Sequence, residues 1–364
     1  MTKIVFVLPV QSAVHCYKRI RCLQDLGVET DIYSFERDYY PSKLRPAEYV
    51  SLGSISHGRY YKRLVPLARA MTTIRKAAES ADVVYAFGLD ILLQAFLATR
   101  GLSRAPKLVY EATDIRSILT QQTPQSVALR WLERFLLRRV HLLVVTSEAF
   151  VSGYYQGVQG VQVPYLVIEN KLMAEAMPVF TPVSRPNDGV LRIGYFGHIR
   201  CRASWEVLKE VARVSEGRVQ VQVAGILNDI ATAQVDLAAT PGMIYRGSFV
   251  SPDDLPALYS QVDVSWAAHF HGINNTKWAR GNRFYEGCYF QKPMFAQIGT
   301  VDGEVVASKG LGLCLDLADK DACVQTVLST RFSDLDQWRQ NIAALPRNMY
   351  VLTDEHKRLL EGLR

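Results

Sequence analysis

The strongest constraint on the fold of this 364-residue chain is a repeated alternation of short strand-like runs with helical patterns. Residues 4–8 are apolar throughout, as expected for a strand buried on both faces of a parallel sheet. Further strands are predicted at 142–146 and 191–195, and helices at 13–26 and 126–140. Strands and helices that alternate through short links predict parallel sheets joined by right-handed crossovers.

The alternation stops at residues 176–189, where Pro178, Pro182 and Pro186 accumulate, and it restarts at Leu191. We therefore expect an α/β protein of two doubly wound, Rossmann-like domains that face a cleft. Residues 1–175 are assigned to the first domain, 176–189 to the linker, 190–348 to the second domain and 349–364 to a C-terminal helix. Sheets of this kind bind ligands beyond the carboxyl ends of their strands.

Several other classes are excluded by what the sequence lacks. No glycine occurs in residues 9–13, so GxGxxG does not follow the first strand, and no Walker loop is present. The six cysteines are scattered and form no CxxC pair, which favours a reduced compartment without metal or disulfide roles. The chain has no apolar run of about 18 residues, and its N-terminal run is too short for a secretory signal. We expect a cytoplasmic protein without a redox cofactor.

The most informative stretch for function is residues 282–296, NRFYEGCYFQKPMFA. Its single carboxylate, Glu286, lies in a short amphipathic segment that is followed by Lys292, Pro293 and a short apolar strand. A carboxylate near a helix N-terminus can accept both hydroxyls of a ribose, while the N–H groups of that terminus bind phosphates. The stretch resembles the nucleotide-binding signature of GT-B glycosyltransferases, with Asn282 and Arg283 beside the carboxylate.

A second segment, residues 193–208, resembles the diphosphate-binding turn of the same family. Gly197 matches the glycine of the turn, and Arg202 lies about where the family has a basic residue, with Arg200 as the alternative. Helix N–H groups and guanidinium groups both suit a diphosphate. A surface arginine at a helix start is the competing interpretation, although it would slightly oppose the helix dipole.

A third segment, residues 247–259, resembles the part of the family that contacts the nucleotide base. The resemblance places Phe249 and Val250 beside the base. Ser251 and Asp254 are also explained as the capping residues of a helix, and both interpretations can hold together. The resemblance further implies that the C-terminal helix, 349–364, returns to the first domain.

The long polar loop after the strand at 262–267 is expected to meet the donor sugar and its diphosphate. The candidates are His271, Asn274, Asn275, Lys277 and Arg280. Retaining members of the family usually have a second glutamate eight residues before the ribose glutamate, and here that position is Trp278. This argues against a retaining reaction. His269 and His271 form an HxH pair, but the family generally needs no metal, and none is expected.

The best candidate for a catalytic base is Asp114, which follows the strand predicted at 107–111. A carboxylate at a strand end can take the proton of an acceptor hydroxyl, and the resemblance gives this role to an acid of the first domain. Glu111 is the second candidate and His15 the third. Asp114 is equally explained as an N-cap.

Residues 1–175 contain 22 basic and 15 acidic residues, which accounts for the whole net charge of +7. Two basic amphipathic segments in this half suit an anionic membrane surface, although solvated helix faces explain them equally well one at a time. The residues concerned are Arg59, Lys62, Arg63, Arg69, Trp131, Arg134, Arg138 and Arg139. No nucleic-acid-binding motif accompanies the charge.

Together these features predict a metal-independent, inverting glycosyltransferase of polysaccharide biosynthesis, peripheral on the inner face of the cytoplasmic membrane. Its donor is a UDP- or GDP-linked sugar, and its acceptor is a polyprenyl-diphosphate-linked saccharide. Two alternatives remain, a nucleotide-sugar 2-epimerase and a non-catalytic nucleotide-sugar-binding protein. The charge asymmetry argues against the epimerase, and the intact segment around Glu286 argues against the binding protein.

Overall fold

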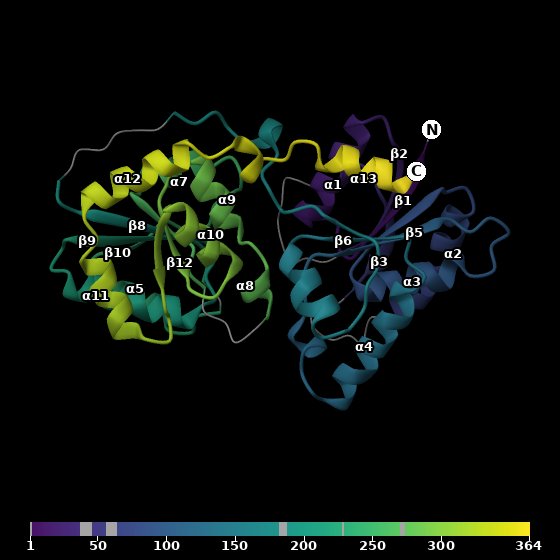
Figure 1. Cartoon of the computed structure of the whole chain (residues 1–364), viewed down its shortest axis with the longest axis horizontal. Coiled ribbons are helices and arrows are strands. Elements are labelled where there is room, and N and C mark those ends of the chain that lie inside the picture. Colours follow the sequence, from purple (N-terminus) through teal and green to yellow (C-terminus); the bar gives the residue numbers. More distant parts are fainter. Residues whose placement is uncertain (1, 37–45, 56–63, 182–187, 228, 270–273) are drawn as a thin grey trace. The chain divides into compact units, whose positions relative to one another are not determined.

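The computed structural model describes residues 2–36, 46–55, 64–181, 188–227, 229–269 and 274–364. Its contacts divide the chain into two compact units, Met1–Asn170 with Thr353–Arg364, and Lys171–Leu352. By this division residues 176–189 belong to the second unit, and the last twelve residues belong to the first. Figure 1 shows the elements of both units.

The first unit is built on a parallel sheet with strand order β3-β2-β1-β4-β5-β6-β7. All neighbouring strands in it run parallel, and β1, β4 and β6 are buried along nearly their whole length. The strands are β1 (Lys3–Leu8), β2 (Glu29–Glu36), β3 (Val50–Ser54), β4 (Val83–Phe87), β5 (Lys107–Ala112), β6 (Leu142–Val145) and β7 (Tyr165–Val167).

Helices cover both faces of this sheet. Figure 1 shows α1 and α13 on one face and α2, α3 and α4 on the other. The start of α4 follows from its sequence, since the Thr123 side chain accepts the N–H of Ser126 at 3.2 Å and Pro124 occupies the first turn. The helices are α1 (Val14–Asp25), α2 (Leu64–Ala78), α3 (Leu89–Thr99), α4 (Pro124–Leu137), the π-helix η3 (Phe150–Gln156) and α13 (Glu355–Leu363).

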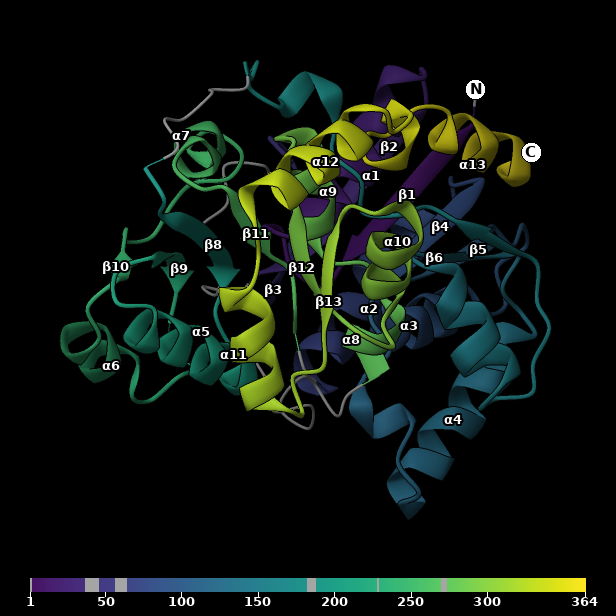
Figure 2. The ribbon, with the colours of Figure 1, turned by 60° about the vertical axis from the view of Figure 1, so that its left-hand side comes forward.

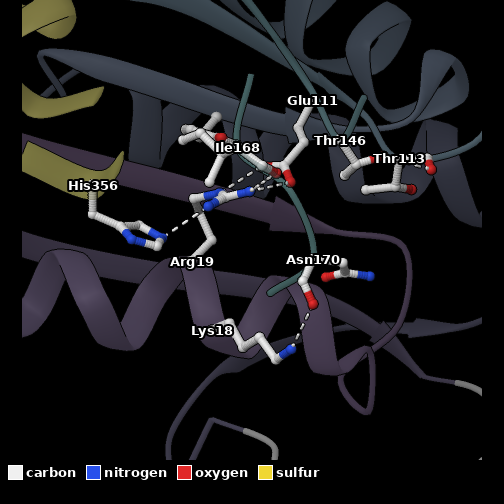
Figure 3. Close-up of polar contacts among 9 residues, drawn as sticks. Lys18, Arg19, Glu111, Thr113, Thr146, Ile168, Asn170 and His356 are labelled. Carbon is white, nitrogen blue, oxygen red and sulfur yellow. Dashed lines mark hydrogen bonds and ion pairs between the residues drawn. The ribbon is translucent and has the colours of Figure 1, made fainter. Parts of the chain in front are cut away.

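A buried arginine joins four segments of the first unit (Figure 3). Arg19 of α1 donates Nε and Nη2 to the carboxylate of Glu111 on β5 at 2.9 and 2.8 Å. Its Nη1 lies 2.8 Å from Nε2 of His356 on α13, and Nη2 lies 3.5 Å from the carbonyl oxygen of Ile168. Tyr85 of β4 donates its hydroxyl to the same carboxylate at 2.5 Å. One ion pair therefore links α1, two strands and the C-terminal helix.

The Arg19–His356 contact requires His356 to be neutral, because a guanidinium nitrogen only donates. Burial and the adjacent Arg19 charge lower the pKa of His356 to about 3, which keeps its ring uncharged at neutral pH. A second contact of the C-terminal segment is made by Lys107, whose Nζ donates to the carbonyl of Arg364 at 2.7 Å. Polar contacts thus attach α13 to the sheet at both its ends.

The second unit repeats the architecture with strand order β10-β9-β8-β11-β12-β13, again parallel throughout. Its strands are β8 (Leu191–His198), β9 (Val219–Ile226), β10 (Met243–Tyr245), β11 (Val264–Trp266), β12 (Met294–Gln297) and β13 (Gly312–Leu315). Its helices are α5 (Arg202–Val214), α6 (Ala233–Ala239), α7 (Leu255–Ser260), α8 (Asn274–Trp278), α9 (Asn282–Tyr289), α10 (Val301–Lys309), α11 (Lys320–Leu328) and α12 (Phe332–Ala343).

The two faces of this second sheet carry separate hydrophobic clusters. On one face α5 and α11 lie side by side, as Figure 2 shows, over a cluster that includes Trp205, Trp266 and Phe295. On the other face α7 and α9 pack over a cluster that includes Tyr259 and Phe284. The prediction of two doubly wound parallel α/β domains is confirmed.

We expect Glu111→Gln to lower the free energy of unfolding of the protein by about 3–5 kcal/mol, because the substitution leaves the buried Arg19 charge without a counter-charge. Urea titration followed by circular dichroism measures the change.

The matched control is Arg21→Gln on the same helix. Arg21 pairs with Asp25 at 3.1 Å, but both side chains are about half exposed, so the loss should stay below about 1 kcal/mol. Equal losses in the two variants would show that the Arg19–Glu111 pair is no more important than a surface contact.

Candidate active site

The strand order places a candidate site in each sheet. In the first sheet the order reverses between β1 and β4, and in the second it reverses between β8 and β11. Parallel sheets bind ligands at the carboxyl ends of the strands on either side of such a reversal. In the first unit the loops at these ends contain Ser12 and Gly88, and in the second unit Gly197 lies at the carboxyl end of β8 itself.

The carboxyl end of β8, together with the turn that follows it, has a backbone suited to binding a phosphate. Gly197 adopts φ 108°, which favours glycine, and pairs with Gly225 of β9. A Cβ atom on Gly225 would lie 2.0 Å from the Gly197 carbonyl oxygen, so the two backbones approach too closely for side chains. The exposed side chains of Arg200 and Arg202 stand at the start of α5. The N–H groups of that helix start and the two guanidinium groups suit a diphosphate.

Arg283 of α9 contacts the backbone at the carboxyl end of β8. Its Nε donates to the carbonyl of Phe196 at 2.5 Å, and its Nη2 donates to the carbonyl of His198 at 3.3 Å. The guanidinium carbon lies 4.6 Å from the centre of the Tyr195 ring. The sequence predicted Arg283 as a donor-binding residue, and the structure places it against the backbone of the turn expected to bind the diphosphate.

Glu286 lies one helical turn after Arg283 and is half-buried. Its Oε2 accepts the hydroxyl of Tyr259 on α7 at 2.8 Å. Tyr259 is fully buried and stacks on Phe290 with ring centres 4.6 Å apart. Burial and the Glu286 charge raise the pKa of Tyr259 well above its usual range, so the hydroxyl stays protonated and donates. This contact orients the carboxylate predicted to bind the ribose.

The start of α9 is fixed by Asp302 of α10. Asp302 accepts the N–H of Gly281 at 2.9 Å and lies 3.5 Å from Nε of Arg280, whose guanidinium also covers the ring of Phe284 at 4.6 Å. Arg280 and Asp302 are both nearly buried. This pairing favours a positioning role for Arg280 rather than the predicted contact with the donor sugar and its diphosphate.

The remaining donor-side candidates lie on separate segments. Asn282 is the exposed first residue of α9, and Lys277 is exposed on α8. Asn274 and Asn275 begin α8, and His271 lies outside the described residues. Val250, in the loop after β10, donates its N–H to Asp254 at 2.7 Å, while Phe249 packs partly buried against the second unit's core.

In the first unit the three candidate acid–base residues differ in exposure. Asp114 is exposed, two residues after β5. Glu111 is fully buried and accepts from Arg19 and Tyr85, so the geometry favours a structural role for it rather than a catalytic one. His15 is half-buried on the first turn of α1, and desolvation lowers its pKa against the opposing charges of Glu111 and Asp114.

The loop between β1 and α1 contributes a buried hydroxyl. Ser12 is 8% exposed, and its Oγ has no hydrogen-bond partner among the described residues. A buried polar atom of this kind is costly unless a ligand or water satisfies it. Ser12 therefore joins Asp114 and His15 as a candidate contact for an acceptor, three residues before the histidine on the same loop and helix start.

The predicted membrane-facing residues are only partly described. Arg59, Lys62 and Arg63 lie outside the described residues, and Arg69 is exposed on α2. On α4, Trp131 is 66% exposed and stacks on Phe135, whose ring lies 3.7 Å from the guanidinium carbon of Arg139. Arg138 is exposed beside them, and Arg134 is half-buried. No helix in the described ranges combines the length and apolarity needed to cross a bilayer.

Within the part of the chain that the structure describes, no group of three or more His, Cys, Asp or Glu is arranged to hold a metal ion.

Two residues that organise the candidate site, Tyr259 and Asp302, were not predicted from the sequence. Tyr259 stands 27 residues before Glu286, and Asp302 stands 21 residues after Gly281, so no local motif connects either pair.

Comparisons with known proteins agree with this fold. Residues 12–171 match the glycosyl transferase 4-like domain. The chain is 28% identical over 314 residues to the succinoglycan biosynthesis protein ExoL of Rhizobium meliloti, which covers 83% of this chain and 78% of the relative. Anabaena HepE, solved with UDP and glucose, superposes with a TM-score of 0.72 at 14% identity over 100% of this chain and 99% of HepE. WaaG, a glycosyltransferase of lipopolysaccharide biosynthesis, superposes with a TM-score of 0.71 at 12% identity over 99% of each chain.

Replacing Arg283 by lysine should weaken UDP binding about tenfold, because one ammonium group cannot hold the carbonyls of both Phe196 and His198 in place. Isothermal titration calorimetry with UDP measures the affinity. Arg213→Lys on the exposed side of α5, where Arg213 pairs with Glu210, should leave the affinity unchanged. Equal affinities in the two variants would contradict the bracing role of Arg283.

Proposed function

We propose that this chain, which has the GT-B fold and is similar to glycosyltransferases, transfers a hexosyl or glycuronosyl group from a UDP-linked donor to a saccharide acceptor in exopolysaccharide assembly. The observation that carries the proposal is the arrangement on α9, where Arg283 braces the glycine turn and Glu286 is oriented by Tyr259 one helical turn later. This arrangement suits a ribose next to a diphosphate.

UDP is preferred to GDP because HepE, which shares the fold over its whole length, has been solved with UDP, with UDP and glucose, and with UDP-glucose. The role in polysaccharide assembly rests on the likeness to ExoL. In the proposal, Glu286 accepts the ribose hydroxyls, and Phe249 and Val250 lie beside the uracil.

The proposed chemistry is a single displacement at the anomeric carbon. The acceptor oxygen forms the new glycosidic bond as the bond to UDP breaks, and Asp114 takes the proton of the acceptor hydroxyl. Ser12 donates to the acceptor from its buried position. Arg200 and Arg202, with the start of α5, stabilise the negative charge that develops on the leaving diphosphate, and no metal is invoked. A single displacement inverts the anomeric configuration.

The acceptor is proposed to be carried on a lipid diphosphate at the inner face of the cytoplasmic membrane. The exposed Trp131, stacked above Phe135 with Arg138 and Arg139 nearby, supports this part of the proposal. An exposed tryptophan and several arginines on one amphipathic helix favour the interface of an anionic bilayer. The charge excess of residues 1–175 acts in the same direction.

The donor and base assignments predict opposite phenotypes for two variants. Glu286→Ala should lose UDP binding, because the ribose hydroxyls lose their acceptor. Asp114→Asn should bind UDP like the wild type but lose about 100-fold or more in transfer rate, because the amide cannot take a proton. Calorimetric titration with UDP, GDP and ADP gives the affinities, and release of UDP from UDP-sugars in the presence of membrane extract gives the rate.

Asp25→Asn serves as the control for both variants, since Asp25 is an exposed carboxylate at the far end of α1. Failure of all three nucleotides to bind the wild type at millimolar concentration would refute the proposed donor. Full turnover by Asp114→Asn would exclude Asp114 as the catalytic base and make His15 the candidate.

The proposed association with an anionic membrane predicts that the protein floats with vesicles containing phosphatidylglycerol but not with purely zwitterionic vesicles. The triple substitution Trp131→Ala, Arg138→Gln, Arg139→Gln should abolish most of the binding, and raised salt should weaken it in the wild type. Substituting three exposed basic residues of the second unit, Arg213, Lys320 and Arg331, by glutamine is the matched control. Equal flotation of both triple variants would contradict docking through α4.

A further inference from the structure

A groove of about 670 Å³ lies in the first unit. One wall is α1, and the other is formed by β2 and residues 46–50 before and at the start of β3. Its lining includes Tyr17, Tyr33, Tyr49, Arg21, Gln24 and Asp31. None of the residues proposed to bind the donor or to activate the acceptor lines it.

The groove follows α1 from Tyr17 to Gln24. Tyr17, Arg21 and Gln24 follow each other at spacings of four and three, so they share one face of the helix. The helix begins directly after the loop that contains Ser12, and Gln24 near its end donates to Thr30 at 2.9 Å. Tyr17 to Gln24 spans about 10 Å at 1.5 Å per residue.

The aromatic residues of the groove lie toward the carboxyl ends of the strands, which is the edge of the sheet near Ser12. Tyr17 lies in the first turns of α1, which begins where β1 ends. Tyr33 lies in the carboxyl half of β2 and pairs with Val50, the neighbour of Tyr49. Three tyrosines from three different segments therefore converge at the end of the groove nearer to Ser12. All three are half-buried, with part of each side chain exposed to the groove.

The polar groups of the groove indicate its ligand. Asp31 is held by Lys3 at 3.0 Å, and Glu48 is exposed, so the lining has two carboxylates against one guanidinium, that of Arg21. Such a lining disfavours phosphates and other anions. Aromatic faces next to carboxylate, amide and hydroxyl groups instead match a pyranose, which has apolar C–H faces and a rim of hydroxyls.

We propose that this groove binds a chain of neutral pyranose residues belonging to the acceptor saccharide. The reactive hydroxyl lies at the end near Ser12 and Asp114, and the following sugars extend along α1 over the tyrosines. The groove is longer than one pyranose ring, so the enzyme recognises an oligosaccharide rather than a single sugar. This inference rests on the proposed function, because it names the acceptor of the same reaction.

The test measures the affinity of the full-length protein for cellotetraose and maltotetraose by saturation-transfer NMR and calorimetry. These probes are neutral pyranose chains with β and α linkages. Tyr17→Ala and Tyr49→Ala should each weaken binding at least about fivefold, because each removes one aromatic face. Glu48 is exposed, so Glu48→Gln should not affect folding, and it should weaken tetrasaccharide binding about twofold. Tyr165→Ala, on the edge strand β7 outside the groove, should leave it unchanged.

UDP affinity is measured on the same samples to separate this inference from the proposed function. If UDP binds and neither tetrasaccharide does, or if Tyr165→Ala weakens tetrasaccharide binding as much as the groove variants, the groove proposal is overturned and the donor proposal stands. If the tetrasaccharides bind through Tyr17 and Tyr49 but no nucleotide binds, the donor proposal fails and the groove remains a saccharide site. Loss of both activities in one groove variant, with an unchanged melting temperature, would refute the separation of the two sites.

Discussion

The first unit depends on one buried ion pair, the contact between Arg19 and Glu111. Both groups are almost inaccessible to water, so each would be very costly without the other. The geometry is bidentate, and Tyr85, Ile168 and His356 take up further hydrogen-bonding capacity of the pair. Because the partners come from α1, β4, β5 and α13, the pair fixes the elements whose ends display Ser12, His15 and Asp114.

The second unit uses a similar contact nearer to its proposed ligand site. Arg283 places its guanidinium against the carboxyl end of β8 and donates to the carbonyl groups of two residues there. Asp302 fixes the start of the helix that carries Arg283, and Tyr259 orients Glu286 on its next turn. Side chains that do not face the ligand thus hold those that do, which is the preorganisation that electrostatic catalysis requires. In both units an arginine between a helix and a strand end sets this geometry.

Much of the fold was predictable, because buried parallel strands require apolar runs and the helices between them require amphipathic faces. Residues 4–8 became the interior strand β1, which begins one residue earlier, and residues 142–146 became β6, which is one residue shorter. Site candidates could be named from the sequence only where a function imposes a local motif, as in the segment around Glu286. Glu111 is a residue whose role could not be predicted from the sequence. A carboxylate at a strand end looks the same in sequence whether it faces solvent or a buried arginine, and here it faces Arg19.

The sequence by itself determined the class of the protein, since strand periodicity, the absence of GxGxxG and the segment at 282–296 are all local in the chain. Only the tertiary structure decided which charges are committed to the scaffold. Arg280 pairs with Asp302, Arg283 braces a turn, and Glu111 closes an ion pair with a residue 92 positions away. The reason is physical: the pKa and the availability of a side chain depend on burial and on partners that chain folding brings from distant segments. Those partners leave no periodic or local trace in the sequence.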